Sequence, residues 1–497
     1  MHQTTDQNAP LFKLCRSVGL DHPTVTICCA QFGASLISGV VSFYYVKVFL
    51  TVFHISDWWF QIAQMLFMIW NAVNDPLFGY DVGVCGGQCS WMRKRRLAVL
   101  YVGPLIAVST MLFWLPLSGN DSPPYVVGLH LIIALFFYDG FVSFAMLAYA
   151  SLFAEFSTDH NERVRLIRYN QVAYLLSAIS VVIVEKASSS LQDMVAFRVT
   201  TTILVSISVA AYLYTGLYAR DSIAQVDNQI VQARDTEILE LHRSTWQRGW
   251  RLTKQVLSSS NFQCITCTHF FHIAHAVIHT SFTAIFTESL IPRTVLPLGS
   301  WNISLFYWIN RITPQLCVIT FGRVLEQQGP CNVYKKCLIV SSCAAVIMLV
   351  VGRHNPYLVM GFIWLDSLII FVCQPLFMIL FPDVIDEDMV RHRRSTPVSS
   401  MMFSLQAMLT KPAESLGPMF VVAVLDAYNY DDYKVKAPAR EFVSTDQTEW
   451  SELRDCMFTV LCGSTLVLSM VMYIVLCKYS LHDKHKRPVI VSDGTGI

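Results

Sequence analysis

Long apolar runs, separated by short polar segments, recur along the whole chain of 497 residues. A helix that crosses a bilayer needs roughly 20 apolar residues, because about 30 Å of hydrocarbon is crossed at about 1.5 Å per residue. Lipid offers no hydrogen-bond partner to backbone amides, so such runs are expected to be helical. The runs that meet this requirement number twelve: residues 24–53, 57–80, 97–117, 125–156, 166–186, 196–218, 261–289, 295–322, 336–352, 357–383, 397–427 and 456–477.

The composition agrees with a membrane protein and excludes other classes. Apolar residues make up 54% of the chain and charged residues only 14%, whereas ordinary soluble domains carry about 25% charged residues. The formal charge of +1 argues against nucleic acid as a partner, since such binders need a basic face. We therefore expect an all-α polytopic membrane protein whose partners are the lipid bilayer and a small-molecule substrate of unknown identity. No enzyme motif, cofactor motif or catalytic metal set is present in the sequence, and we expect a monomer.

The distribution of Lys and Arg predicts the orientation, because cytoplasmic segments of membrane proteins accumulate these residues. If the N-terminus is cytoplasmic, the inner segments and both tails hold 25 of the 36 basic residues and the outer segments hold 8. We therefore expect cytoplasmic N- and C-termini, which agrees with an even number of spans. We favour the plasma membrane over internal membranes.

One long inner segment divides the spans into two groups of six. The expected parts, in chain order, are a cytoplasmic tail (1–23), a six-helix bundle (24–218), a cytoplasmic central loop (219–260), a second six-helix bundle (261–477) and a cytoplasmic tail (478–497). A repeat supports this division, since Glu155 and Arg163 after the fourth span recur as Asp383 and Arg391 after the tenth. Paired six-helix repeats around a central cavity are typical of transporters.

Charged side chains inside apolar spans are costly and mark functional sites. The second span carries Asn71 and Asp75, and the eleventh span carries Lys411 and Glu414. Lys411 could pair locally with Glu414, three residues along the same helix face. We favour the other interpretation, in which Lys411 faces a cavity and neutralises a substrate or an acid on the second span.

Three further charged residues, Asp139, Arg311 and Asp366, lie within the fourth, eighth and tenth spans. The hypothesis is that they form one buried charge network that touches the substrate. The alternative is a structural salt bridge between helices, which we favour slightly for Arg311.

The seventh span carries His269, His272, His275 and His279, whose spacing places them on one helix face. Ligands strung over about 15 Å of one helix are too far apart for a single metal ion, so no metal site is expected. Proton relay from a cavity is one interpretation, with His275 and His279 as candidates, and hydrogen bonding between helices is the other.

Several motifs resemble the glycoside–pentoside–hexuronide:cation symporters, the melibiose-permease branch of the major facilitator superfamily. The segment Asn74–Gly79 matches the signature of their second helix, Glu155–Arg163 the charged stretch after the fourth, and Asp386–Lys411 the loop and lysine of the eleventh. This resemblance implies a major facilitator fold of two six-helix halves and cation-coupled uptake by alternating access, with Na⁺ or H⁺ as the coupling ion. In that family, acids on helices two and four bind the cation near the helix-eleven lysine, and Asp75 and Lys411 carry over. The charges that the resemblance assigns to inner loops and gating are Glu155, Arg163, Asp386, Arg391 and Arg393.

The sequence also departs from the family pattern. Asn71 replaces the second acid of helix two, Met146 falls at the position of the helix-four acid, and no acid lies between Asp21 and Asp57. Three hypotheses stay open: a symporter of a small, sugar-like polar solute, a carrier of a lysolipid or other amphiphile, and a transporter-like protein that moves nothing. Loss of the acids favours the third hypothesis, and retention of Asp75 and Lys411 argues against it.

Overall fold

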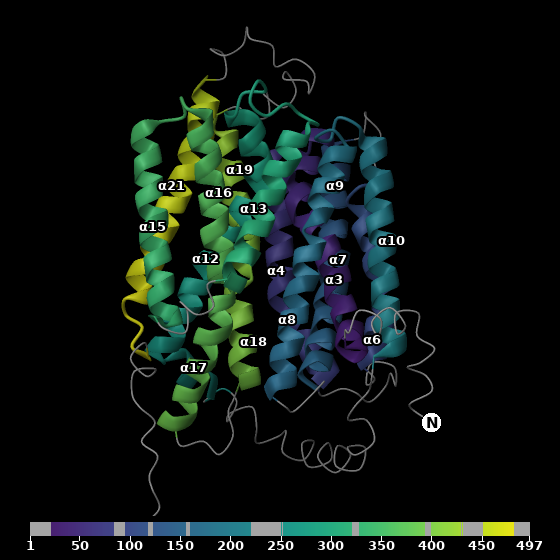
Figure 1. Ribbon diagram of the computed structural model, residues 1–497, viewed down its shortest axis with the longest axis vertical. Coiled ribbons are helices and arrows are strands. Elements are labelled where there is room, and N and C mark those ends of the chain that lie inside the picture. The colour runs from purple at the N-terminus through teal and green to yellow at the C-terminus, as the bar shows by residue number, and fades with distance from the viewer. Residues whose placement is uncertain are drawn as a thin grey trace, which may run out of the picture.

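The computed structural model describes residues 21–83, 95–117, 123–155, 160–219, 250, 252–320, 328–392, 399–428, 430 and 451–481, apart from some helical side chains. Within these residues the chain is a bundle of long helices that run along one common direction (Figure 1). The first group consists of α3 (His22–Lys47) with its π-helical continuation η1 (Val48–Val52), α4 (Asp57–Gly83), α6 (Arg95–Leu112), α7 (Pro124–Glu155), α8 (His160–Ser177), α9 (Ile179–Ala187) and α10 (Met194–Tyr218).

The second group of helices follows the central segment of the chain. It consists of α12 (Ser260–Leu290), α13 (Trp301–Thr320), α15 (Pro330–Val351), α16 (Pro356–Cys373) with the short η2 (Gln374–Leu376), α17 (Phe377–Arg391), α18 (Ser399–Thr410), α19 (Pro412–Asp426) and α21 (Ser451–Leu476). The boundaries predicted around the central loop, 219–260, stay a prediction, since most of that loop lies outside the described residues.

Each predicted apolar run contains one helix or two consecutive helices, in the same chain order, so the all-helical membrane architecture is confirmed. Within the described residues, eight helices or helix pairs are long and apolar enough to cross a membrane by length and composition alone. One predicted boundary is wrong. The segment around Asp386, expected as a loop, is the last part of α17, which continues to Arg391.

The extension of α17 has a local cause. No glycine or proline follows Pro382 in this stretch, so nothing interrupts the helix. Asn261 at the start of α12 donates a hydrogen bond to Glu387 at 2.7 Å, and Asp388 lies 3.0 Å from His392 one turn later. The first contact holds the additional turns of α17 against the first turn of α12, and the second lies within the end of α17.

Several helices begin where the sequence supplies a capping group. Asp193 accepts hydrogen bonds from the amides of Val195 and Ala196 at 3.0 and 2.9 Å, and Asn355 accepts one from Tyr357 at 3.0 Å. Such side chains satisfy the first amides of a helix, which have no partner within it. Proline at the first helical position, as in α15, α16 and α19, fits because its missing N–H is not needed there.

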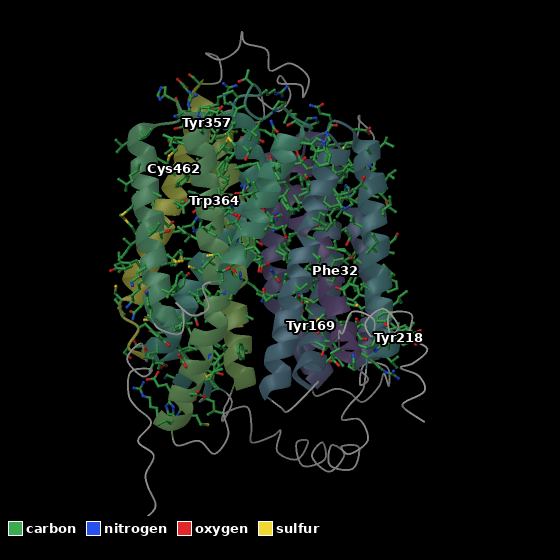
Figure 2. All side chains as sticks on the ribbon, viewed as in Figure 1. Phe32, Tyr169, Tyr218, Tyr357, Trp364 and Cys462 are labelled. Carbon is green, nitrogen blue, oxygen red and sulfur yellow. The ribbon has the colours of Figure 1, made fainter. Side chains whose placement is uncertain are left out.

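The two groups of helices meet along one seam. On one side lie α3, α4 and α9, and on the other lie α12, α13, α18 and α19. Away from the seam, α10 packs on α3 and α6 in the first group, and α15 packs on α16 and α21 in the second, as the two sides of Figure 1 show. Aromatic side chains mark both ends of the bundle, with Tyr357 near the upper end and Tyr218 near the lower end (Figure 2).

Close packing of α10 on α6 requires a glycine at position 216. A Cβ atom there would lie 2.5 Å from Leu100 Cβ and 2.8 Å from its Cα. We expect Gly216→Ala to lower the stability of the purified protein by about 1–3 kcal/mol, the usual cost of overpacking. Thermal unfolding in detergent measures this.

Gly463 in α21 is the matched control, since nothing lies within 4 Å of a Cβ built on it. Gly463→Ala should leave the unfolding temperature unchanged or raise it, because alanine favours a helix over glycine by about 1 kcal/mol. Equal unfolding temperatures for the two variants would contradict the packing argument.

Candidate functional site

A group of polar side chains lies at the seam, within the apolar part of the bundle. We call it the central cluster and define it as Asn71, Asn74, Asp139, Ser143, Lys411 and Glu414. It combines residues of α4 and α7 from the first group of helices with the junction between α18 and α19 from the second. The cluster therefore joins two parts of the chain that lie more than 260 residues apart in sequence.

Asn74 is the centre of this cluster and is fully buried. Its amide nitrogen donates to Asp139 Oδ2 and lies 3.5 Å from Ser143 Oγ. Its carbonyl oxygen accepts from Lys411 Nζ at 3.4 Å, and Lys411 Nζ also lies 3.4 Å from Ser143 Oγ. The amide nitrogen of Asn74 thus donates to a carboxylate, and its carbonyl oxygen accepts from an ammonium group.

A second contact of the cluster joins Asn71 and Glu414. The amide nitrogen of Asn71 donates to Glu414 Oε2 at 3.0 Å, and Asn71 is fully buried. Glu414 lies in the first turn of α19, where the positive end of the helix dipole favours a carboxylate. Asn71 stands where the resemblance expects an acid, and Glu414 of α19 brings a carboxylate to this position.

Lys411 lies at the junction between two helices. Helix α18 ends at Thr410 and α19 begins at Pro412, so Lys411 is the cap residue between them. Proline cannot donate to the preceding turn, which interrupts the helix there. Nearby, Gln61 Nε2 donates to the carbonyl of Met419 at 2.9 Å and ties α4 to α19 a second time.

The predicted candidate Asp75 lies in α4, but its side chain is outside the described part of the structure. The same holds for the side chains of Glu155 and Arg163. Arg393 lies wholly outside the described residues. Asp386 and Arg391 are exposed on α17. Arg391 borders a cavity of about 350 Å³ between the end of α17 and the segment before α12. The inner-loop charges that the structure describes are therefore solvent-facing and remote from the central cluster.

The histidines of α12 form a hydrogen-bonded ladder in the second group of helices. Gln406 lies 3.1 Å from His269 Nδ1. His272 contacts Gln374 Oε1 through Nε2 and the hydroxyl of Tyr334 through Nδ1, both at 3.0 Å. Both ring nitrogens of His272 therefore have a polar partner. Within the described chain, no group of three His, Cys, Asp or Glu side chains is arranged to hold a metal ion.

The ladder ends at Asp366, which is 2% exposed. His279 Nδ1 contacts Asp366 Oδ2 at 2.9 Å, and His275 Nε2 lies 3.1 Å from Oδ1 and 3.2 Å from the hydroxyl of Thr465. Oδ1 has no hydrogen bond of good geometry, so its contact with His275 is a close approach of the two polar atoms. Asp366 thus obtains its partners from α12.

The expected charge network of Asp139, Arg311 and Asp366 does not form. Asp366 is held by histidines and Asp139 belongs to the central cluster. The guanidinium of Arg311 lies between two aromatic rings, with its carbon 5.9 Å from the centre of Phe43 and 5.7 Å from that of Phe371. No ion pair of Arg311 exists within the described residues, so the interhelical salt bridge expected for it is also wrong.

A second polar contact crosses the seam, and it was not expected from the sequence. Lys47 near the end of α3 forms an ion pair with Glu288 near the end of α12, and the lysine is only 3% exposed. Close by, Lys186 Nζ donates to the carbonyl of Gly299 at 2.6 Å, and Tyr44 donates to the buried Glu185 at 2.6 Å. The position of Lys47 inside an apolar run was the signal that could have identified it.

Comparison with known proteins places these features in context. Residues 26–483 match the family described as MFS/sugar transport protein. Transmembrane protein 180 of Gallus gallus is 24% identical over 479 residues, which cover 92% of each chain. The crystal structure of a D-xylose-proton symporter superposes with a TM-score of 0.57 at 13% identity, covering 90% of this chain and 96% of that one. The crystal structure of the peptide transporter POT in complex with sulfate gives a TM-score of 0.58 at 11% identity, covering 96% and 98%.

The buried ion pair between Lys47 and Glu288 generates a stability prediction. Lys47→Met removes the cation and leaves the carboxylate of Glu288, whose side chain is 19% exposed, without this partner. We expect a loss of about 3–5 kcal/mol, as when one partner of a buried pair is removed. The double variant Lys47→Met, Glu288→Met should recover most of this loss in thermal unfolding.

The exposed pair of Arg353 and Asp455 is the matched control, with side chains that are 29% and 62% exposed. Arg353→Met should change stability by about 0–1 kcal/mol, as is usual for surface pairs. A double variant at positions 47 and 288 that is as unstable as Lys47→Met would show that the loss does not come from the unpaired carboxylate.

Proposed function

We propose a transport function from one premise: the chain belongs to the MFS/sugar transport protein family and has the fold of a major-facilitator secondary transporter. The protein carries a small polar solute across the membrane by alternating access, coupled to the movement of a cation. Its N- and C-termini face the cytoplasm, and it works as a monomer in the plasma membrane. The central cluster is the coupling site.

The observation that carries this proposal is that the central cluster spans the seam. Lys411 and Glu414 come from one half, and they contact Asn74, Ser143 and Asn71 of the other half. When the halves rock apart, these contacts must break or exchange partners. Any ligand that binds the cluster in only one of the two arrangements shifts the balance between them, which is the requirement for coupling.

The charges of the cluster favour a cation as the coupling ligand. Its described side chains include two carboxylates, Asp139 and Glu414, and one ammonium group, Lys411. Carboxylates in a largely apolar surrounding are stabilised by a bound cation or by a proton. Carboxylate and amide oxygens are suitable ligands for a hard cation.

The contacts near the ends of α3 and α12 support alternating access. In this structure the halves are joined there by Lys47 with Glu288 and by Lys186 with Gly299. The predicted orientation places these contacts on the outer side. The structure then corresponds to a state closed to the outside, and the outward-open state requires these contacts to separate.

Neutralising one acid of the cluster should uncouple transport. In proteoliposomes, we expect Asp139→Asn to lower gradient-driven uptake by about 10-fold or more, because a charged hydrogen bond is worth about 1.5–3 kcal/mol. Exchange of labelled for unlabelled solute without a gradient should persist. The labelled panel comprises monosaccharides, nucleosides, dipeptides, small monocarboxylates and a lysophospholipid, each tested with sodium and with proton gradients.

Asp426→Asn is the matched control, because Asp426 is an exposed acid at the end of α19. It should leave uptake unchanged. Full gradient-driven uptake by Asp139→Asn would remove Asp139 from the coupling site. Absence of flux for every labelled solute, with either gradient, would overturn the transport function itself.

A further inference from the structure

A small cavity lies at the seam, separate from the central cluster. We call it the seam cavity, and its lining residues include Phe43, Tyr307, Asn310, Arg311, Ser367 and Phe371. Phe43 belongs to α3 of the first half, and the others belong to α13 and α16 of the second half. In this closed arrangement its volume is about 10 Å³, which is about the space of one water molecule.

Arg311 brings a positive charge to this cavity without an anionic partner. Its Nη2 atom is buried and has no hydrogen-bond acceptor, and no ion pair involves it within the described residues. Burying a charge is very costly unless the charge is paired and hydrogen-bonded. The rings of Phe43 and Phe371 offset part of this cost through cation–π contacts, but they cannot accept the in-plane hydrogen bonds of the guanidinium.

Asn310 adds a second unsatisfied group on the same wall. It is only 5% exposed, and neither its amide nitrogen nor its carbonyl oxygen has a hydrogen-bond partner. Its backbone is well fixed, since the carbonyl accepts a hydrogen bond from Ser367 at 3.0 Å. Buried polar side chains are nearly always hydrogen-bonded, so two adjacent exceptions at one cavity point to a polar ligand that binds there.

We propose that the seam cavity binds the carboxylate group of a small organic monoanion, with Arg311 and Asn310 as its hydrogen-bond donors. Guanidinium and carboxylate groups match in a planar, two-pronged geometry. The aromatic rings around the guanidinium provide an apolar surface for the body of the ligand, and Phe43 and Tyr307 meet edge to face with their centres 4.9 Å apart.

The charge at the cavity selects a monoanion over a phosphate dianion. Within the described lining, Arg311 is the only permanent cation. His279 also borders the cavity, but its Nδ1 atom is committed to Asp366. A doubly charged phosphate would therefore keep one uncompensated charge in an apolar surrounding, which is strongly unfavourable.

The position of the cavity explains how a ligand larger than water enters it. Phe43 closes the cavity from the opposite half, so rocking of the halves moves this wall away from Arg311. The ligand then binds in the opened state, and the closed state holds its carboxylate between the halves. This inference rests on the proposed transport function and names the chemical class of its solute.

Ligand-dependent thermal unfolding of the purified full-length protein tests the inference. The probes are acetate, butyrate and benzoate, each compared with its neutral amide at constant ionic strength. A ligand that binds only the folded protein raises the unfolding temperature with its concentration. We expect at least one carboxylate to raise it saturably and its amide to have no effect, and methylphosphonate dianion to bind more weakly than that carboxylate.

Variants identify the donors. We expect Arg311→Gln to weaken carboxylate binding by about 10- to 100-fold and Arg311→Lys to weaken it less, because lysine keeps the charge but loses the planar fork. Asn310→Asp keeps the size of the side chain and places a fixed carboxylate beside the guanidinium. It should abolish binding, and it answers the question independently if the Arg311 variants fold poorly. Arg353→Gln, at an arginine in an exposed ion pair, is the control.

Three results would overturn the carboxylate site: equal shifts from a carboxylate and its amide, undiminished binding by Arg311→Gln or Asn310→Asp, or no shift from any carboxylate. Tighter binding of the phosphonate dianion would overturn the monoanion class. Failure of the carboxylate site is distinguishable from failure of the transport function, because the unfolding measurements need no gradient or flux. Arg311-dependent binding without any flux would leave the site intact and refute only the transport function.

Discussion

The cost of an unsatisfied polar or charged group in an apolar surrounding governs this structure. It makes every span helical, because only a helix satisfies the backbone within the segment. It also decides where the few charged side chains within the spans lie. Asp366 is surrounded by histidines of α12, Lys411 reaches the amide of Asn74, and Lys47 pairs with Glu288. Each of these groups is balanced by a partner from another helix.

The same constraint connects stability with function. Several buried polar contacts cross the seam between the two halves, and these interactions must change when the halves move. Lys47 with Glu288 joins them near one end, and the central cluster joins them near the middle of α4. A change of protonation or of bound ion at such a contact alters the relative stability of the two arrangements, and no further structural element is needed.

The family and the fold follow from similarity to known proteins. The identity of the solute has to be inferred from the chemistry of the site. Two structures of the same fold are named for D-xylose and for peptides, which illustrates that one fold serves several substrates. The departures from the symporter pattern gain meaning from the structure. Asn71 stands where the resemblance expects an acid, but Glu414 brings a carboxylate to it from the opposite half. Met146 stands where the resemblance expects the acid of helix four. Asp139, seven residues earlier, brings a carboxylate to Asn74.

The sequence by itself determined the architecture, because apolar runs of sufficient length have only one structural solution in lipid. It also located most of the chemically important residues, since a charge within such a run is conspicuous. The partners of these residues were decided by the tertiary structure alone. Asp139, Arg311 and Asp366 looked equivalent in the sequence, yet helix packing gives them an amide, two aromatic rings and two histidines, respectively. Periodicity fixes the face of a helix on which a residue lies, whereas the identity of its neighbour depends on the rotation and offset of helices far apart in the chain.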